Sequence, residues 1–449
     1  MGDGSSSSKR AWVRDAQKTL SAAVGSVEVS QWQGNCIYRV PAFIKDLNAK
    51  AYQPQVVSLG PFHHDDKELL PMEEQKRRAL RHLLRRARKP LEEFVAAIEE
   101  AAEQLESMYL NLDDRWRGVE GRERFLEMMV VDGCFVLEVI RAADPTSANN
   151  VGDYAPNDPV FSQHGVLYMV PYIRRDMLML ENQLPLFLLA KLIAVETASA
   201  PNDGAINSMM LRFLSATSNM PLAGVGLGLH PLDVYRRSMI YGPYQTLGGS
   251  HDVPETGIMW SAVKLNKAGI RFKKSITNSF HDIQFRQSHL LVSMPALVVD
   301  DFTEYTLLNM VAFERLHVSA GNDVSVYLFF MNNIIRSADD VALLCSNGII
   351  QNATGNDRVV ADLFINITKN MVLVPSNPLY AILRQLNTYC RKPLNIYRAT
   401  FADYYFRNPA TVANSMVAVM ALIATLMQTV YTVLQYFQSN TTAAPGPSA

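Results

Sequence analysis

The chain has 449 residues, 48% of them hydrophobic, which is enough to bury a large core in one body or in two domains that share an interface. Its 42 Lys and Arg nearly balance its 43 Asp and Glu, so the charge gives no global attraction to nucleic acid and no nucleic-acid partner is expected. Four cysteines without a CxxC pair argue against a zinc cluster and against a secreted disulfide framework.

The N-terminal part of the chain predicts little regular structure. Residues 1–30 form a Ser-rich, flexible leader in which only residues 15–28 favour a weak helix. Two short β-rich runs follow at residues 36–40 and 55–59, each ended by proline or glycine. They are predicted to be short strands around a loop.

A helical layer is predicted between residues 72 and 142. Prolines bracket its first helix, 72–89, and apolar residues recur there at helical spacing. Residues 96–112 and 122–142 continue the pattern. The last segment places six side chains for burial: Phe125, Met128, Met129, Phe135, Val136 and Val139.

The first of these helices is strongly basic between Lys76 and Lys89. Such a run attracts acidic lipid or RNA, but no aromatic residues are interleaved for base stacking. Glutamates follow closely at positions 92, 93, 99, 100, 103 and 106. We therefore expect the charges to match within the chain, across an antiparallel helix pair.

The central part alternates irregular and regular segments. Residues 144–159 are a loop by composition, and 172–197 return to helix with a break at Pro185. Residues 215–257, rich in Gly and Pro, are predicted to be a long, exposed, irregular insertion. Residues 269–301 carry the alternation of two or three antiparallel strands. Helices are predicted at 302–313, 324–336, 338–345, 358–370 and 378–390, so the fold class is mainly α with a small antiparallel β-sheet (α+β).

The C-terminal segment is free of charge, since no Lys, Arg, Asp or Glu follows Arg407. As a helix, its apolar run 412–437 reaches about 39 Å, against a hydrocarbon core of about 30 Å. Aromatic residues lie at both ends, and cations precede the run while none follows it. These features predict a single-pass, tail-anchored protein with a cytosolic body at 31–407, a membrane-anchoring transmembrane helix at 408–437 and a short tail at 438–449. They are the same for any membrane, and the one that we expect is the plasma membrane.

A polar stripe interrupts the second half of this run. It consists of Thr425, Gln428, Thr429, Thr432 and Gln435, which recur at helical spacing. The stripe suits a partner helix in the membrane, and it equally suits water on one side of a soluble C-terminal core helix. Both alternatives stay open at the level of sequence.

Several strings along the chain resemble the plant family called domain of unknown function 247. They are IYRVPAFI (37–44), VVSLGPFHH (56–64), MEEQKRRAL (72–80), VVDGCFVLE (130–138), DMLMLENQLPLFLL (176–189), AGIRF (268–272), DVALLCSNGIIQN (340–352) and YYFRNP (404–409). The resemblance extends from about residue 37 to residue 437, and the combination of DGCF with ENQLP is its most specific part. Asp65 and Ala410 depart from the pattern, where a glycine and a tryptophan are usual.

The resemblance implies a plant protein that often ends in a membrane helix and has no established enzymatic activity. Some grass members are implicated as pollen-side determinants of self-incompatibility, so it implies a role in recognition or signalling. We therefore expect a membrane-anchored interaction protein that binds protein partners through exposed loops, such as 144–159 and 215–257, and membrane lipid through its C-terminal helix. No catalytic residue is assigned.

Four carboxylates suggest an alternative function. Asp132, Glu138, Asp176 and Glu181 are candidates for a hydrolase, which needs an acid and a base or nucleophile flanking the scissile bond. They lie within strongly apolar segments, which favours burial and pairing instead. The chain has no G-x-S-x-G string and no catalytic cysteine signature. The alternative predicts that some of the four converge at an open cleft.

Two further motifs predict neither a metal nor a cofactor. His63, His64, Asp65 and Asp66 are a dense cluster of possible metal ligands, but adjacent side chains point apart, so a solvated turn is expected. The glycine-rich residues 224–228 lack the Lys-Ser/Thr ending of a P-loop.

Overall fold

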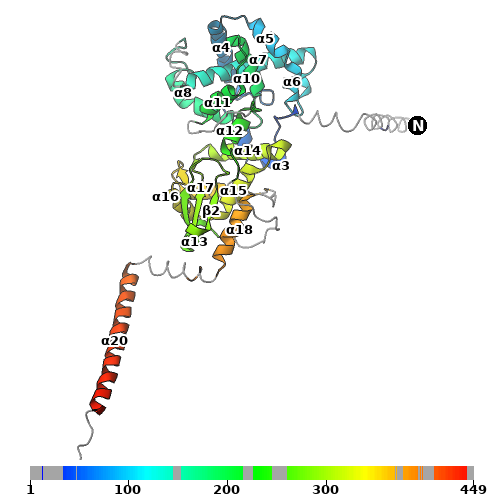
Figure 1. Ribbon diagram of the computed structural model, residues 1–449. Helices are drawn as coiled ribbons and strands as arrows, with labels where there is room; N and C mark the ends of the chain where they lie inside the picture. Colours follow the sequence, from blue (N-terminus) through cyan, green and yellow to red (C-terminus); the bar gives the residue numbers. More distant parts are fainter. Residues whose placement is uncertain are drawn as a thin grey trace, which may run out of the picture.

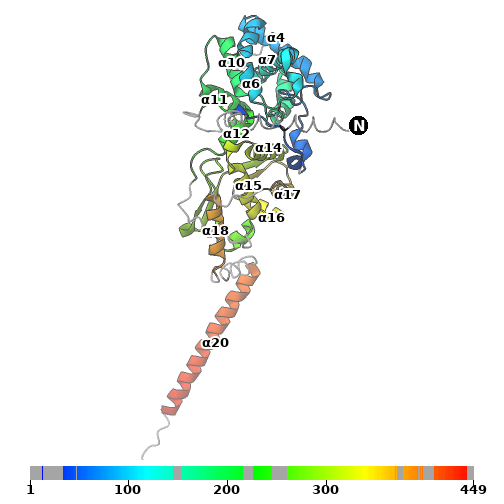
Figure 2. The ribbon, with the colours of Figure 1, turned by 90° about the vertical axis from the view of Figure 1, so that its right-hand side faces the viewer.

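The computed structural model consists of two stacked lobes and one separate helix (Figure 1). It describes residues 34–46, 48–144, 153–215, 226–244, 260–369, 378–392 and 409–441, and the single positions 13, 371, 395 and 397. Figure 2 shows the same order of parts from the side, with α14 (Thr303–Leu316) at the junction of the lobes. The predicted helix at 15–28 lies outside the described residues.

The N-terminal lobe is built around α7 (Gly118–Ala143), which is buried almost continuously in its second half. All six side chains predicted for burial in this helix are buried. Helices α4 (Leu70–Ala87), α5 (Leu91–Glu99) and α10 (Leu186–Thr197) pack against α7. The lobe also contains α3 (Ala42–Lys45), η1 (Ala49–Tyr52), α6 (Ala102–Ser107), η2 (Asp114–Trp116), α8 (Gln163–Tyr168), α9 (Val170–Asp176), α11 (Asp203–Leu214) and α12 (Pro231–Met239).

Gly133 explains the close approach of α7 and α10. A Cβ atom at this position would lie 2.3 Å from Cδ1 of Leu192 in α10. The glycine of the DGCF string is therefore a packing residue, because any larger side chain would push the two helices apart.

The C-terminal lobe surrounds two small sheets with helices. In the first sheet, β3 (Leu291–Met294) is central, with β1 (Arg271–Lys274) parallel to it and β2 (Gln284–Arg286) antiparallel to it. In the second, β4 (Leu297–Val299) pairs in parallel with β5 (Ile350–Asn352). The helices are α13 (Ala262–Lys267), α14, α15 (Asp323–Ile334), α16 (Ala338–Ser346), α17 (Asp357–Ile367) and α18 (Pro378–Cys390), with short turns η4 (Gln287–His289) and η5 (Val318–Ala320).

The prediction of a mainly α protein with a small sheet is confirmed, but the strand pairing is mixed rather than wholly antiparallel. Sequence alternation locates strands without fixing their neighbours. Here β2 and β3 form an antiparallel hairpin through η4, and β1 pairs with the other edge of β3 in the parallel direction.

Two predicted strands and part of a predicted loop differ from the structure. Residues 36–40 contribute only an isolated bridge between Ile37 and Tyr109, and 55–59 form no strand. Within 215–257, residues 216–225 and 245–259 lie outside the described residues, while Pro231–Met239 is α12 rather than irregular chain. His230 caps this helix by accepting a hydrogen bond from the backbone N–H of Asp233.

Each lobe has its own hydrophobic core, and the two cores meet at the junction. The C-terminal core includes side chains from the N-terminal half of the sequence, namely Tyr38, Val40, Ile44, Ala51, Tyr52, Leu178, Leu180 and Leu232. Segments 38–52 and 178–180 therefore belong by sequence to one lobe and by packing to the other. This sharing joins the lobes through buried contacts.

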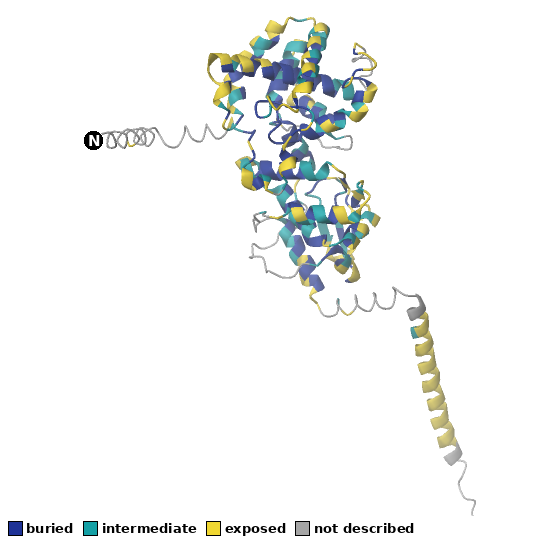
Figure 3. Cartoon of the chain, turned by 180° about the vertical axis from the view of Figure 1, so that it is seen from behind, coloured by how far each residue is buried: buried dark blue, intermediate teal, exposed yellow. Residues whose placement is uncertain are grey.

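Helix α20 (Pro409–Thr441) stands apart from the body. It begins at Pro409, as predicted from the tolerance of proline for a first helical position. Its segment Ala413–Gln438 is long and apolar enough to cross a membrane, and none of it is buried. Figure 3 shows nearly all of the residues coloured for burial in this helix as exposed. Within the described chain, no element covers its apolar side chains as the soluble-core alternative requires.

Candidate functional site

A loop at residues 55–63 is held from several sides by buried polar side chains. Oδ2 of Asp176 accepts the backbone N–H groups of residues 55, 56 and 57 at 3.0, 2.7 and 3.1 Å. Oδ1 of Asn182 accepts the N–H of Leu59 at 2.7 Å, and Asp132 accepts that of Gly60 at 2.8 Å. Side chains thus satisfy the backbone donors that a neighbouring strand would otherwise bind, which is why the predicted strand is absent.

Gly60 has a backbone conformation that suits glycine. Its φ is +74°, and a Cβ atom would lie 2.9 Å from the carbonyl oxygen of Gln183. The hydroxyl of Tyr109 donates to the same carbonyl at 3.0 Å. The glycine of the VVSLGPFHH string therefore lets the loop pass directly over the ENQLP turn.

Asp132 forms a buried ion pair with Lys76 of α4. The Nζ atom of Lys76 lies 2.7 Å from Oδ1 of Asp132, and both side chains are almost inaccessible to water. The same ammonium donates to Glu73 at 2.6 Å and to Ser58 at 3.1 Å. Burial raises the pKa of Asp132, and the nearby Lys76 opposes that rise.

Glu138, one α-helical turn and a half further along α7, has a different set of partners. Arg86 and Arg141 both donate to its carboxylate, and the hydroxyl of Tyr154 donates to Oε2 at 2.7 Å. Burial, together with the charge of Glu138, raises the pKa of the Tyr154 hydroxyl. The carboxylate is therefore enclosed by two guanidinium groups and a neutral phenol.

Asp176 and Glu181 lie at the two ends of the turn that follows α9. Asp176 accepts a hydrogen bond from its neighbour Arg175 at 2.7 Å, and burial raises its pKa against the effect of that arginine. Glu181 accepts from Lys45 at 2.9 Å and from the N–H of Val40 at 2.5 Å. Burial alone would raise the pKa of Glu181, but its hydrogen bonds to His63 and Lys45 outweigh burial and lower it.

The four carboxylates thus have four separate sets of partners. None of them lines the open pocket described below. A hydrolase of the paired-carboxylate type needs two such groups facing one substrate. The geometry of these residues is that of buried ion pairs which fix one segment against another, and it gives the hydrolase alternative no shared cleft.

The histidine and aspartate cluster at 63–66 divides among different neighbours. His63 contacts Asp66 through Nδ1 at 2.7 Å, and Asp65 binds Arg115 at 2.7 Å. The ring of His64 packs edge-on against Trp116. Among the residues that the structure describes, no group of three or more His, Cys, Asp or Glu side chains is placed to hold a metal ion.

The basic helix α4 pairs mainly with partners other than the expected glutamates. Arg77, Arg78 and Arg86 bind Glu127, Asp158 and Glu138 respectively. Lys89 is an exception, since it binds Glu93 at 3.3 Å. The charges do match within the chain, but chiefly between α4 and α7 because these two helices are neighbours.

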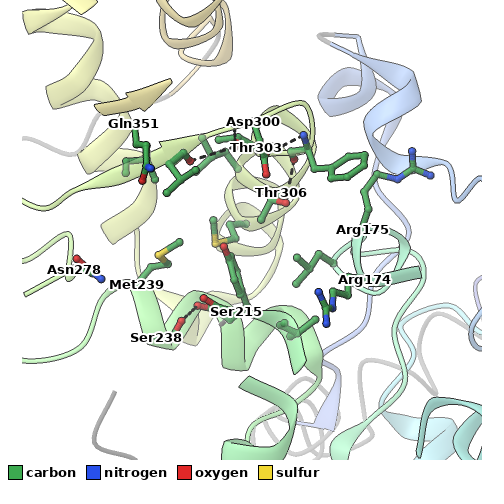
Figure 4. A pocket seen from close by; sticks show the side chains of 18 of the residues that line it. Arg174, Arg175, Ser215, Ser238, Met239, Asn278, Asp300, Thr303, Thr306 and Gln351 are labelled. Carbon is green, nitrogen blue, oxygen red and sulfur yellow. Dashed lines mark hydrogen bonds between the residues drawn. The ribbon is translucent and has the colours of Figure 1, made fainter. Parts of the chain in front are cut away.

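An open pocket of about 500 Å³ lies where the two lobes meet. Figure 4 shows its walls, which come from α9, α12, β4 and α14. Leu178, Leu307 and Met310 contribute apolar surface, and polar side chains at its rim include Lys274, Asn278 and Gln351. Sequence patterns do not predict this pocket, because its lining residues come from segments up to 180 residues apart.

Two adjacent arginines of α9 differ in their partners. Arg175 is bound by Asp176 and also donates to Gln55 at 2.6 Å. Arg174 lies over the ring of Phe213, with its Cζ atom 4.8 Å from the ring centre, and its Nε is buried without a hydrogen-bond partner in the described structure. In Figure 4 the side chain of Arg175 runs away from the pocket, whereas Arg174 lies along its wall.

Asp300 and Tyr235 are two further ionisable residues that line the pocket. Asp300 accepts hydrogen bonds from the hydroxyl of Thr303 and the N–H of Phe302, so it is engaged at the start of α14. Burial, with a smaller effect of Asp300, raises the pKa of Tyr235 to about 12. The Tyr235 hydroxyl is therefore a neutral donor at ordinary pH.

A family model described as a plant protein of unknown function, DUF247, matches residues 37–424. The chain belongs to the DUF247 family. The resemblance seen in its motifs is thereby confirmed, and it covers both lobes and much of α20. The family's description assigns no activity.

Two relatives from Arabidopsis thaliana are similar over nearly the whole length of this DUF247 chain. UPF0481 protein At3g47200 is 28% identical over 452 residues, which cover 92% of this chain and 90% of the relative. Putative UPF0481 protein At3g02645 is 21% identical over 520 residues, with 93% of each covered. No solved structure matches the chain.

Proposed function

We propose that this DUF247 protein is a single-pass membrane protein whose two-lobed body lies in the cytosol and binds protein partners. The observation that supports it is α20, a charge-free helix whose apolar side chains no described element covers. An uncovered apolar helix of 26 residues is costly in water and favourable in a bilayer.

The polar stripe of α20 is compatible with insertion. Thr425, Thr429 and Thr432 each donate a hydrogen bond of 2.8 Å to the carbonyl four residues earlier, so their hydroxyls are satisfied within the helix. Gln428 and Gln435 lie one heptad apart on the same face. A glutamine face of this kind suits a neighbouring helix in the membrane.

The proposed orientation, with the body on the cytosolic side of the membrane, rests on the asymmetry of charge around α20. Arg391, Lys392, Arg398 and Arg407 precede α20, and no cation follows it. Positive residues stay preferentially on the cytosolic side, which supports a cytosolic body. The choice of the plasma membrane, and a role in signalling such as pollen self-incompatibility, rest on the family resemblance alone.

Protein partners are supported by exposed apolar side chains on the body. Leu167 and Tyr168 of α8 are 64% and 57% exposed, and Phe43 of α3 is 66% exposed. Contiguous exposed apolar groups often mark sites of protein interaction, and Leu167 and Tyr168 are adjacent. Loops such as 144–159 and 215–257, only partly described by the structure, are where we expect partner choice to be determined.

A charge placed in the middle of α20 tests the anchor. An arginine at the centre of a membrane helix costs about 2.5–3.5 kcal/mol on the insertion scale, so Leu426→Arg should move the chain from carbonate-resistant membranes into the supernatant. Leu426→Met is the matched control and should remain in the membrane. Release of the wild-type chain by carbonate would contradict the proposal.

Partner binding needs a separate measurement. Proximity labelling in plant cells should mark one set of proteins near the full-length chain and lose the membrane-bound ones in Leu426→Arg. Exchanging the loops 144–159 and 215–257 between this chain and a relative should exchange the labelled partners. If the partners follow the helices instead, the loops do not carry the specificity.

A further inference from the structure

We propose that the pocket between the two lobes binds a small amphipathic carboxylate, with its acidic group on Arg174 and its apolar part against Leu307 and Met310. Residues of both lobes would then contact one ligand. This inference concerns the body alone, and the nanodiscs used in the test below serve only to keep the apolar helix α20 of the full chain in solution.

The size and lining of the pocket suit a small molecule. Its volume of about 500 Å³ lies within the range of about 300–1,000 Å³ that is common for ligand sites. Such sites are mainly apolar with a few polar groups that fix orientation. Leu178, Leu307 and Met310 provide apolar wall, and Arg174 and Tyr235 provide donors. The lining also includes Lys274 and the carboxylate of Asp300, which is engaged by Thr303 and the N–H of Phe302.

Arg174 is the group that selects the ligand's charge. The buried arginines Arg175 and Arg236 are each bound by a carboxylate, Asp176 and Glu314 respectively. Arg174 has no such partner among the described residues, and its Nε is buried without an acceptor. Burial is the cause that lowers the pKa of Arg174, with no carboxylate acting on it.

A ligand carboxylate would supply what this arginine lacks. A guanidinium group binds a carboxylate through two parallel N–H···O bonds. These bonds would be favourable in the pocket, because Arg174 is only partly hydrated at its wall. Among the cations that line the pocket, Arg175 is bound by Asp176 and Lys274 is exposed, so Arg174 is the partly buried cation that lacks a carboxylate in the described structure. This arrangement favours a ligand with one negative charge and an apolar part.

The test uses the full chain in nanodiscs of phosphatidylcholine and the fluorescent carboxylate dansylglycine as probe. Dansylamide has the same fluorophore without the carboxylate, and empty nanodiscs correct for partition into lipid. We expect saturable binding of dansylglycine and at least tenfold weaker binding of dansylamide. Absence of saturable dansylglycine binding, or equal affinity for both probes, would overturn the proposal.

Variants locate the binding site. Arg174→Gln should weaken dansylglycine binding about ten- to hundredfold, as loss of a charged hydrogen bond does, and Arg174→Lys should restore part of it. Arg212→Gln changes an exposed arginine of α11 outside the pocket and should bind normally. Unchanged affinity of Arg174→Gln for dansylglycine would show that Arg174 does not bind the carboxylate of the probe.

A second variant distinguishes loss of binding from loss of folding. Thr306→Phe places a ring in the pocket from a partly exposed position of α14, so it should abolish binding of the probe while the thermal unfolding midpoint stays close to that of the wild type. Undiminished binding in Thr306→Phe would place the probe elsewhere and contradict the proposal.

Discussion

Lys76 is a fully buried cation whose charge is balanced by Asp132 and Glu73. Lys76→Met keeps most of the side-chain volume but leaves Asp132 buried without its cation. Removing one partner of a buried ion pair costs about 3–5 kcal/mol, so we expect a loss of this size in the free energy of unfolding. Denaturant unfolding monitored by circular dichroism measures it.

The matched control for this prediction is Lys50→Met, which changes an exposed lysine that has no ion pair in the described structure. It should alter the free energy of unfolding by less than about 0.5 kcal/mol. Equal stability of Lys76→Met and Lys50→Met would show that the buried pair contributes nothing net.

His230 predicts a pH dependence of stability. Burial lowers the pKa of His230 from 6.5 to about 4, so the unfolded chain binds a proton below pH 6.5 that the folded chain does not bind until pH 4. Stability therefore falls as the pH falls through this window, and the histidine should contribute about 2–3 kcal/mol of loss at about pH 4.5. Unfolding at about pH 7.5 and pH 4.5 measures the difference.

His230→Asn isolates this contribution. The variant should be less stable at neutral pH, because the contacts of the ring with Cys36 and Asp233 are lost, but its stability should depend less on pH than that of the wild type. His289→Asn, at an exposed position, should keep the wild-type dependence. An unchanged slope in His230→Asn would assign the effect to carboxylates instead.

At the level of single residues, the sequence predicted which carboxylates are buried in ion pairs better than it predicted which residues are their partners. Apolar surroundings indicated that Asp132 and Glu138 are buried and paired, and both have arginine or lysine partners. Lys76 and Arg86 lie 56 and 52 residues from Asp132 and Glu138, so spacing could not identify these two partners. Likewise nothing in the adjacent pair Arg174 and Arg175 shows which one is left without a carboxylate.

At the scale of elements, the ENQLP turn connects several segments through buried hydrogen bonds. Asn182 accepts the N–H of Leu59 and donates to the carbonyls of Val57 and Asp176, each at 3.0 Å. Asn182→Ala would leave these buried backbone groups unpaired, at about 1–3 kcal/mol for each unsatisfied group. We expect a loss of at least about 2 kcal/mol in the free energy of unfolding, measured with urea.

Gln53→Ala is the control for the turn, since Gln53 is exposed and its side chain has no hydrogen bond in the described structure. Hydrogen exchange adds a local readout. Asn182→Ala should speed exchange of the backbone amides of residues 55–60 more than of those in α7. Equally faster amide exchange across both lobes would mean that the turn does not act locally on residues 55–60.

Periodicity predicted the helices well because their apolar faces are formed by residues close in sequence. α7, α14 and α17 appear close to their predicted positions. It failed at residues 55–59, where side chains distant in sequence replace a partner strand. It also missed α12, whose proline and polar residues resemble a loop although its Leu232 and Val234 are buried.

For the whole molecule, the arrangement of two cores explains why a pocket exists at their junction. Segments 38–52 and 178–180 cross from one core to the other, and the pocket lies beside the second of these segments. A surface between two cores cannot be filled as closely as the interior of either, because each lobe packs on its own helices. From the sequence, only the length of the chain indicated that it could form two domains, and no sequence pattern indicated the pocket.

The orientation of the whole chain across the membrane can be read from glycosylation. Two acceptor sequences lie in the body, at Asn352 in β5 and at Asn366 in α17. With a cytosolic body, neither asparagine meets the luminal transferase. A third acceptor sequence at residues 440–442 would lie on the far side, so the test uses the Asn440→Gln variant, which should show no mobility shift that an endoglycosidase removes. An extension after Ala449 that carries an added acceptor sequence should be modified, because it would cross to the far side.

A signal peptide fused before Met1 is the positive control for this prediction. It should carry the body into the lumen and bring modification at Asn352 or Asn366, and the Asn352→Gln, Asn366→Gln double variant should remove that modification. If the unfused chain is already modified at these positions, the body lies on the luminal side and the cations before α20 do not determine its orientation. Since α20 would still span the bilayer in that case, the result separates the direction of insertion from insertion itself.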